Sequence, residues 1–196
     1  MTKIIAITGG IGSGKSTLCS KLKDKGFKIH SSDEQVAKIY KNPDKKFFTY
    51  LRTIGLSKSI SKKNIDKDII SKIIFENKQI RKKLELYIFK IVRKKRSDFI
   101  KQEKEKKTRL IFIDIPLLFE NNLEKQFHKV ISIIASKQVR LKRLKKTRKM
   151  TETQFKNIIK SQTSDVIRKN KSDYVIYNNS TLKDYKTKIN KLINKI

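Results

Sequence analysis

One short loop near the start of the chain constrains the fold more than any other segment. Residues 9–17 read GGIGSGKST, directly after the apolar run KIIAIT at residues 3–8 and before a predicted helix at residues 15–25. The pattern G-x-x-x-x-G-K-[ST] between a strand and a helix is typical of a loop that binds phosphate groups. The sequence therefore predicts an α/β fold in which a first strand leads through this phosphate loop, residues 9–17, into a helix.

The residue types in the phosphate loop suit the binding of a nucleoside triphosphate. Its glycines allow positive φ angles and let backbone N–H groups approach phosphate oxygens. Lys15 is expected to reach the outer phosphates, while the start of the helix adds partial positive charge. The hydroxyl of Ser16 is the predicted Mg²⁺ ligand, and Thr17 is expected to contact phosphate. The predicted nucleotide-binding residues are Gly12, Ser13, Gly14, Lys15, Ser16 and Thr17.

Further apolar runs predict the rest of a parallel sheet. Each run is short and rich in Ile, Val or aromatic residues, as buried parallel strands are. The helix at residues 15–25 joins the first two strands, and Gly26 is placed to end it. A strand–helix–strand unit implies a right-handed crossover, and the series predicts an α/β fold with about five parallel strands. The runs after the first are residues 27–31, 109–115, 129–134 and 173–177.

Two long segments between the strands are predicted to be helical. Residues 34–107 carry apolar residues at steps of three and four, without a strand-like run. Residues 137–170 form the second segment, in which residues 151–154 are placed to cap a new helix. A long helical insertion after the second strand serves as a substrate lobe in many α/β phosphotransferases. We therefore expect one domain over residues 1–196, with a helical substrate lobe at residues 34–107.

The phosphate loop alone leaves open what happens to the nucleotide. Guanine specificity usually needs an Asn-Lys-x-Asp loop, which the sequence lacks, and 196 residues leave little room for a motor ATPase. A small-molecule kinase fits best, and it needs a group that accepts or orients the hydroxyl proton of its acceptor. Asp33 is placed for this at the end of the second strand, the edge where open α/β sheets bind ligands. Its alternative role is to cap the next helix, although Ser32 explains that helix start more simply. Asp114, in the third strand, is a candidate carboxylate on the metal side.

The net charge is the main feature that favours another function. The chain has 50 Lys and Arg against 18 Asp and Glu, a formal charge of +32, which is usual for nucleic-acid binding. The lysines are spread along the whole chain, however, and Arg, the better phosphate ligand, is scarce. We interpret the excess as solvated lysines that result from A/T-rich codon usage, and we do not expect a nucleic-acid partner. The charge should still attract polyanionic small molecules.

Cysteine content and hydropathy bear on the compartment. Cys19 is the one cysteine, so no internal disulfide can form and a reducing compartment is expected. We expect Cys19 to be buried and structural. No run approaches the roughly 18 apolar residues of a membrane span, and the N-terminus has no leader pattern. These features predict a cytoplasmic protein that does not bind membranes.

Four segments together resemble the dephospho-CoA kinase family. ITGGIGSGKST and SSDEQVAK are similar to the opening of that family, and IPLLFENNLE at residues 115–124 is similar to its most distinctive second signature. QVRLKRL and SQTSDVIRKNKSDYVIYNN are similar to its lid and its closing strand. The segments keep the family's order from Thr2 to about Asn179, nearly the whole chain. The resemblance implies a three-layer P-loop fold like that of nucleoside monophosphate kinases, with a lid at residues 137–170.

The resemblance also implies a reaction, which is transfer of the ATP γ-phosphate to the ribose 3′-hydroxyl of dephospho-CoA in the last step of coenzyme A biosynthesis. Asp33 matches the family's catalytic aspartate. Arg140 and Arg143 fall where the family has lid arginines, which would neutralise charge on the transferring phosphoryl group. Taken alone, RLKRLKKTRK at residues 140–149 predicts a solvated basic helix instead. The residues that match the acceptor side are Pro116, Leu117, Leu118 and Glu120.

The chain departs from the family pattern in three places. Phe89-Lys90 stands where the family usually has a His-Pro pair in the substrate lobe. Thr147-Arg148 aligns with an Arg-Asp pair of the lid, and Ser172 replaces an Ala before the aspartate of the last strand. Any role of the family's histidine in holding the acceptor must therefore be absent or replaced, and the sequence leaves the effect of the three departures on activity open.

Two other functions remain open on the sequence. A different small-molecule or nucleoside monophosphate kinase would share every feature except the IPLLFE block, and a nucleic-acid-associated NTPase or binding module is favoured by the charge of +32. The preferred hypothesis is a monomeric kinase with ATP and Mg²⁺ as cofactors and dephospho-CoA as its small-molecule partner.

Overall fold

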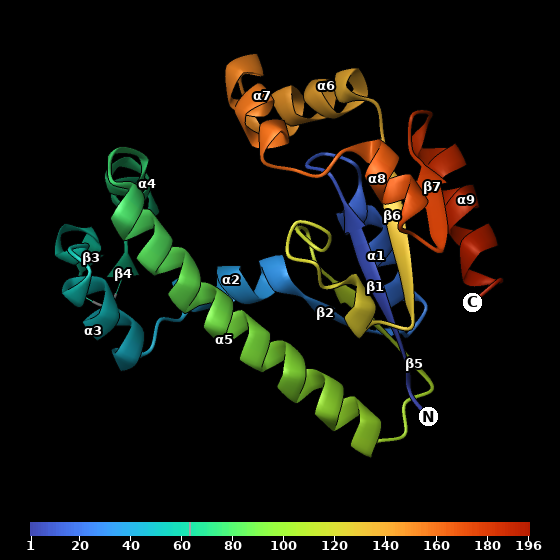
Figure 1. The fold of residues 1–196 in the computed structure, drawn as a ribbon, viewed down its shortest axis with the longest axis horizontal. Helices are drawn as coiled ribbons and strands as arrows, with labels where there is room; N and C mark the ends of the chain where they lie inside the picture. The colour runs from blue at the N-terminus through green and yellow to red at the C-terminus, as the bar shows by residue number, and fades with distance from the viewer. Residues whose placement is uncertain (63) are drawn as a thin grey trace. The chain divides into compact units, whose positions relative to one another are not determined.

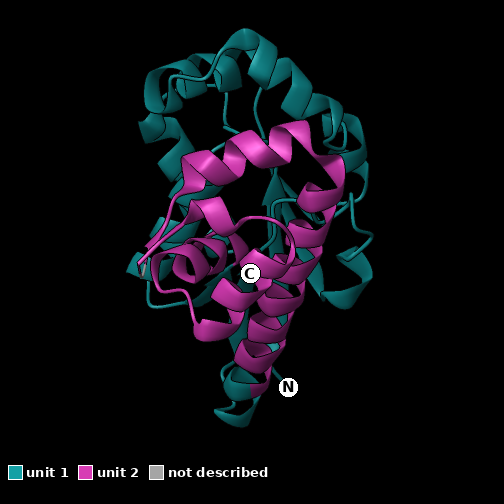
Figure 2. Ribbon diagram, turned by 90° about the vertical axis from the view of Figure 1, so that its left-hand side faces the viewer, with its two compact units in different colours: residues 1–31, 102–196 teal, residues 32–101 magenta. Residues whose placement is uncertain are grey.

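The computed structural model describes residues 1–62 and 64–196. Their contacts divide the chain into two compact units, which Figure 2 shows in two colours. Unit 1 comprises residues 1–31 and 102–196, and unit 2 comprises residues 32–101. Unit 1 contains the sheet and the phosphate loop, whereas unit 2 contains most of the segment that was expected to form the helical substrate lobe.

A five-stranded parallel sheet forms the centre of unit 1, with the strand order β2-β5-β1-β6-β7 (Figure 1). Each of the five apolar runs in the sequence becomes one of these strands, so the predicted parallel sheet is confirmed. Most positions of β1, β5 and β6 are buried, which explains why these strands are continuous apolar runs and do not alternate with polar residues. The strands are β1 Lys3–Gly9, β2 Lys28–Ser31, β5 Leu110–Asp114, β6 Lys129–Ile134 and β7 Tyr174–Tyr177.

The register of the strands brings three chain segments together at the carboxyl edge of the sheet. Asp114, the last residue of β5, is paired with Ile7 of β1 on one side and with Ser31 of β2 on the other. Gly9, where β1 passes into the phosphate loop, is paired with Ile133 of β6. Open parallel sheets bind their ligands at this edge, so the pairing brings the phosphate loop, the end of β2 and the segment after β5 to one place.

Helices α1 and α9 pack on one face of the sheet in a single apolar cluster. Leu18 and Leu22 of α1 and Ile189 of α9 are fully buried there, and burial of each such side chain contributes about 1.5–3 kcal/mol. Cys19 is also buried in this cluster, as a structural thiol is expected to be. The other helices of unit 1 follow β6, and a short 3₁₀ helix, η2, precedes it. The bounds are α1 Lys15–Asp24, η2 Glu124–Gln126, α6 Lys137–Arg148, α7 Glu152–Lys160, α8 Asp165–Asn170 and α9 Leu182–Ile193.

Side-chain caps precede most of these helices. Thr151 precedes α7 and forms a capping box with Gln154, so the start that was predicted near Glu152 is confirmed. α1 differs, because it begins at the phosphate loop with Gly14 as its N-cap and without a side-chain cap. No side chain of the described residues therefore occupies the first N–H groups of α1 at the loop.

Unit 2 is helical around a separate apolar cluster that includes Phe47, Leu51 and Leu84. Tyr87 stacks on Tyr50 with 3.9 Å between ring centroids, and on Phe47 with 5.8 Å. The sequence predicted no strand in this segment, yet β3 and β4 pair as a short antiparallel ladder. The elements are α2 Ser32–Lys41, α3 Lys45–Thr53, the 3₁₀ helix η1 Ser57–Ser59, β3 Ile60–Ser61, β4 Asn64–Ile65, α4 Lys67–Glu76 and α5 Lys78–Glu105.

In the described part of the chain, no helix combines the length and the apolar character that crossing a membrane requires.

Candidate active site

The phosphate loop is compact and closes on itself between β1 and α1. The Ser13 N–H donates to the Gly10 carbonyl at 3.0 Å, and Lys15 Nζ donates to the Gly9 carbonyl at 3.3 Å. Gly14 has a φ of 106°, a left-handed conformation that a residue with a side chain adopts only with strain. The glycine spacing that identified the loop in the sequence therefore has a conformational cause.

Two side chains from the C-terminal part of the chain bind the outer side of this loop. Asn178 Nδ2 donates to the Ser13 carbonyl at 2.8 Å, and the Tyr185 hydroxyl donates to the Gly14 carbonyl at 3.0 Å. Burial raises the pKa of Tyr185 well above its ordinary value of 10.0, so the phenol stays protonated and remains a donor. A Cβ on Gly14 would clash with Asn178 Nδ2. The Asn178 contact therefore requires glycine at this position.

Arg140 of α6 lies directly on the phosphate loop. Its side chain is almost completely buried, and a Cβ on Gly10 would clash with Arg140 Nη1. Gln162, between α7 and α8, accepts a hydrogen bond from the loop N–H of Ile11 at 3.1 Å. Burial lowers the pKa of Arg140 below its ordinary value of 12.5, which Asp165 partly offsets, but a guanidinium remains charged at neutral pH. The predicted lid segment therefore places a buried positive charge against the loop.

Arg140 is the first of four charged side chains that are linked by ion pairs, and both arginines of this ion-pair series are buried. Arg140 Nη2 lies 3.2 Å from Asp165 Oδ2, and Arg168 Nη1 lies 3.0 Å from Asp165 Oδ1. Arg168 then reaches Glu120 Oε1 through Nη2 at 3.0 Å. Glu120 Oε1 also accepts a hydrogen bond from the Thr163 N–H at 2.7 Å. These ion pairs link the segment after β5 to the part of α6 that contacts the phosphate loop.

The segment after β5 is folded against the sheet, and its residues differ in exposure. Leu118 is fully buried, whereas Pro116, Leu117 and Glu120 are half-buried, and Glu120 forms the ion pair with Arg168. The Pro116 carbonyl accepts a hydrogen bond from the Thr8 hydroxyl at 3.3 Å, which joins the segment to the strand before the phosphate loop. Contact of these four residues with an acceptor stays a prediction.

The two candidate aspartates lie in different units. Asp114 ends β5 in unit 1 and accepts a hydrogen bond from the Ser31 hydroxyl at 3.0 Å. Asp33 lies in unit 2, two positions after the end of β2. α2 begins at Ser32, so Ser32 and Asp33 both lie inside its first turn, where the sequence had suggested a cap before the helix. The contact of Asp33 with a phosphate or an acceptor stays a prediction.

Comparison with known proteins identifies the family to which these features belong. A sequence model of the family described as "Dephospho-CoA kinase" matches residues 3–184. The chain belongs to the dephospho-CoA kinase family. Its predicted classification as an ATP-using kinase of coenzyme A biosynthesis is thereby confirmed.

Relatives of this dephospho-CoA kinase match along the whole chain. A dephospho-CoA kinase of Fusobacterium nucleatum is 38% identical over 190 residues, which cover 96% of this chain and 95% of the relative. One from Oceanobacillus iheyensis is 30% identical over 199 residues, 100% of this chain and 98% of the relative. The structure of the dephospho-CoA kinase from Campylobacter jejuni has 28% identity and a TM-score of 0.74, covering 100% of this chain and 97% of that one. The predicted P-loop kinase fold is therefore confirmed.

The three departures from the pattern of dephospho-CoA kinases have different surroundings. Phe89 lies on α5 with 51% of its surface exposed. Arg148 is the exposed last residue of α6. Ser172 forms a hydrogen bond of 2.7 Å with Ser132 of β6, so this substitution adds a polar contact at the start of β7.

Sequence reasoning did not single out Gln162, Asn178 or Tyr185, although all three contact the phosphate loop. A positional signal existed for Asn178, because it directly follows β7 and therefore lies at the carboxyl edge of the sheet, where ligands bind. Gln162 and Tyr185 have no comparable local signal.

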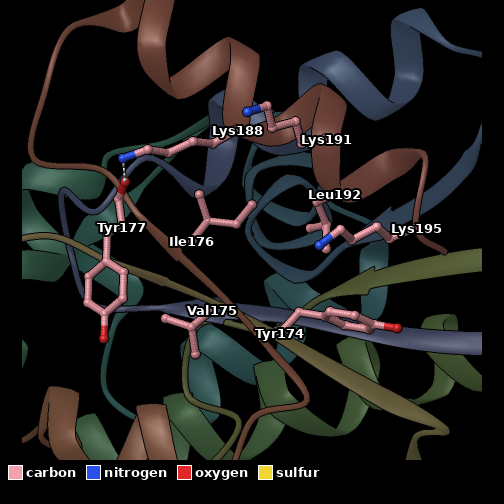
Figure 3. A pocket seen from close by; sticks show the side chains of 8 residues that line it. All are labelled: Tyr174, Val175, Ile176, Tyr177, Lys188, Lys191, Leu192 and Lys195. Carbon is pink, nitrogen blue, oxygen red and sulfur yellow. Dashed lines mark hydrogen bonds between the residues drawn. The ribbon is translucent and has the colours of Figure 1, made fainter.

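A separate hollow of about 280 Å³ lies beside β7, the edge strand of the sheet, and α9 (Figure 3). Lys188, Lys191 and Lys195 contribute to its lining, and Lys188 Nζ donates to the Tyr177 carbonyl at 3.1 Å. Lysines beside an edge strand discourage its pairing with strands of other molecules. The lining contains no residue of the predicted nucleotide site, so we do not assign the hollow to the kinase reaction.

Proposed function

We propose that this chain transfers the γ-phosphate of ATP to the ribose 3′-hydroxyl of dephospho-CoA, with ATP bound by the phosphate loop, Arg140 and Arg143. One observation carries the proposal. In the part of the chain that the structure describes, Arg140 Nε and Arg143 Nη1 are buried without a hydrogen-bond partner. Buried donors nearly always have partners, and charge-assisted bonds to phosphate oxygens would supply them.

Lys15 is proposed to bind the outer phosphates of ATP. Its ammonium donates to the neutral Gly9 carbonyl at 3.3 Å, a long bond that a phosphate oxygen can replace with a stronger, charge-assisted one. The side chain extends from the first turn of α1, where the helix dipole also favours an anion. Lys15 would stabilise the negative charge of the transferring group.

Mg²⁺ is proposed to bind at the same edge of the sheet. The hydroxyl of Ser16 is exposed in the first turn of α1, and Asp114 ends the strand next to β1. Such oxygen ligands suit Mg²⁺, which usually takes one or two protein oxygens and completes its shell with water and phosphate oxygens. We assign Ser16 as the ligand and Asp114 to the metal side. When bound, the ion would neutralise charge on the phosphates.

Asp33 is proposed to accept the proton of the acceptor hydroxyl. Its support is the match to the family's catalytic aspartate and its place in the first turn of α2, directly after a sheet strand. Half-buried Pro116 and Leu117 are proposed to contact the acceptor. Leu118, through its burial, and Glu120, through its ion pair with Arg168, would fix the conformation of this segment.

We further propose that the protein is a cytoplasmic monomer and that nucleic acid is not its partner. The family match supports the cytoplasmic location, and the even spread of lysines along the sequence argues against a nucleic-acid partner. The alternative function is a nucleic-acid-associated NTPase, which the charge of +32 favours.

A single assay separates these functions. ADP release by the purified chain with ATP and Mg²⁺ is measured with dephospho-CoA, with AMP and with single-stranded RNA. We expect release with dephospho-CoA alone, and a product that carries one new phosphate on the ribose 3′-oxygen. Release with AMP would indicate a nucleoside monophosphate kinase, and release stimulated by RNA alone would overturn the proposal in favour of the nucleic-acid alternative.

A further inference from the structure

Asn178 connects two parts of the candidate nucleotide site through one buried side chain. It is 4% exposed and directly follows β7. Its Nδ2 donates to the Ser13 carbonyl of the phosphate loop at 2.8 Å, and its Oδ1 accepts from Arg143 Nη2 at 3.1 Å. Both ends of the amide are therefore used, one by the loop and the other by α6.

The backbone fixes the direction in which this amide points. The Asn178 N–H donates to the Ile134 carbonyl at 2.8 Å, which extends the pairing of β7 with β6 by one residue. The neighbouring Asn179 side chain accepts the Ser136 N–H at 2.7 Å, at the N-cap of α6. With its backbone held by the sheet, the Asn178 amide cannot follow the loop or α6 if either moves away.

Arg143 is oriented by this contact. Its guanidinium is a rigid planar fork, so a bond to one terminal nitrogen also sets the direction of the other. Nη2 is engaged by Asn178, whereas Nη1 is buried and has no hydrogen-bond partner among the residues that the structure describes. One half of the fork is held by protein, and the other half is left for an anion.

A purely structural role explains these contacts poorly. A buried amide costs free energy unless its hydrogen bonds are satisfied, so packing alone would favour an apolar residue after β7. The amide also occupies the space that a Cβ on Gly14 would take, which brings it against the backbone whose N–H groups would receive phosphate. The two partners of the amide are, moreover, the phosphate loop and Arg143, which we propose to bind ATP.

We infer that Asn178 is a positioning residue for ATP, which holds the Ser13–Gly14 part of the phosphate loop and Arg143 in one fixed arrangement so that both meet the same phosphate groups. The inference rests on the proposed function of the phosphate loop. It makes Asn178 act through Ser13 and Arg143, and it predicts that loss of the amide weakens ATP binding while binding of the acceptor is unchanged.

The test compares Asn178→Ala with Asn179→Ala. The control variant also removes a side-chain hydrogen bond to the backbone from the same segment, but the Asn179 bond is to the Ser136 N–H at the start of α6 and not to the phosphate loop. We expect Asn178→Ala to raise the KM for ATP about tenfold, as loss of hydrogen bonds to a charged group does, with the KM for dephospho-CoA unchanged. Asn179→Ala should leave both values within about twofold. If Asn178→Ala does not fold, the isosteric Asn178→Asp, which also lacks the donor to Ser13, replaces it with the same expectation.

A double-mutant cycle with Arg143→Ala checks the route of the effect. If Asn178 acts partly through Arg143, the increase in KM for ATP caused by Asn178→Ala should be clearly smaller in the Arg143→Ala background. A folded Asn178 variant with a normal KM for ATP would overturn the inference, and so would equal effects in the two backgrounds together with a raised KM for dephospho-CoA. Wild-type protein that does not phosphorylate dephospho-CoA would instead overturn the proposed function.

Discussion

The guanidinium of Arg168 and the carboxylate of Glu120 form a buried ion pair, with 3.0 Å between Nη2 and Oε1. Arg168 is 1% exposed and is among the largest fully buried side chains of the described chain. The two residues are 48 positions apart, one in α8 and the other after β5. Asp165 forms ion pairs with both Arg168 and Arg140. The conformation of the predicted acceptor segment and the position of the lid arginine Arg140 therefore both depend on Arg168.

Replacement of Arg168 by Met should destabilise the protein by about 3–5 kcal/mol, because removal of one partner leaves buried charge uncompensated. Two carboxylates, those of Glu120 and Asp165, lose a partner in this variant. The free energy of unfolding is measured by urea denaturation. Lys169→Met is the matched control, since Lys169 is the next residue of α8 and is exposed. A loss below about 1 kcal/mol in Arg168→Met would show that the ion pair contributes little.

Replacement of Lys15 by Ala should lower kcat/KM for ATP by about 10²-fold or more, because it removes a positive charge from the phosphates in the transition state. Lys21→Ala is the control on the same helix. Lys21 forms a partly exposed ion pair of 3.8 Å with Asp24, and such a pair contributes little to stability. Steady-state kinetics at varied ATP concentration measure kcat/KM for the two variants and wild type. Equal kcat/KM for Lys15→Ala and wild type would mean that the phosphate loop is not the ATP site.

Replacement of Asp33 by Asn should lower turnover by about 10²- to 10⁴-fold, the usual range for loss of a general base. ATP binding, measured by calorimetry, should remain close to that of wild type because Asp33 is assigned to the acceptor. Glu34→Gln provides the matched control, since it neutralises a carboxylate in the same first turn of α2. Near-normal turnover in Asp33→Asn would mean that Asp33 is not the general base. It would then act only on the stability of α2, as an acidic residue that interacts with the dipole at the start of a helix.

The sheet could be predicted from the sequence because its signals are local. Each strand is a short Ile- and Val-rich run, and the first leads into a loop whose glycine spacing has a conformational cause. The strand order β2-β5-β1-β6-β7 could not be predicted from the residues, because it depends on pairing between distant segments. The β3–β4 ladder was also missed, since strands of two residues are too short to show a period.

Within the candidate site, the phosphate loop could be predicted from its own residues, and the lid arginines could be predicted through the family resemblance. The other partners of the loop lie far away in the chain. Gln162 is 151 residues from Ile11, and Asn178 is 165 residues from Ser13. Contacts at such separations depend on the completed fold. The place of Asn178 directly after a strand indicates the ligand-binding edge but not its partner, and Gln162 has no period or spacing that reveals its contact.

The pH dependence of stability can be tested at Glu103, near the end of α5 in unit 1. Its carboxylate is 4% exposed and accepts the Thr108 hydroxyl at 2.7 Å and Lys106 Nζ at 3.3 Å. The hydrogen bond from Thr108, with help from Lys106, holds the pKa of Glu103 below its ordinary value of 4.5, against the effect of burial. A lowered pKa in the folded state gives stability that is present above the unfolded-state pKa and is lost as the pH falls through the folded-state pKa.

Replacement of Thr108 by Val should therefore reduce the free energy of unfolding at neutral pH by about 1–2 kcal/mol, the contribution of a hydrogen bond to a charged group. The difference from wild type should narrow as the pH falls from about 5 to about 3, because Glu103 becomes protonated in both proteins. Thr187→Val is the control, since the Thr187 hydroxyl donates to the uncharged carbonyl of Lys183. The change that this variant causes in the free energy of unfolding should not depend on pH. Urea denaturation at several pH values measures both differences, and a Thr108→Val difference that stays constant over this range would contradict the assigned cause of the pKa shift.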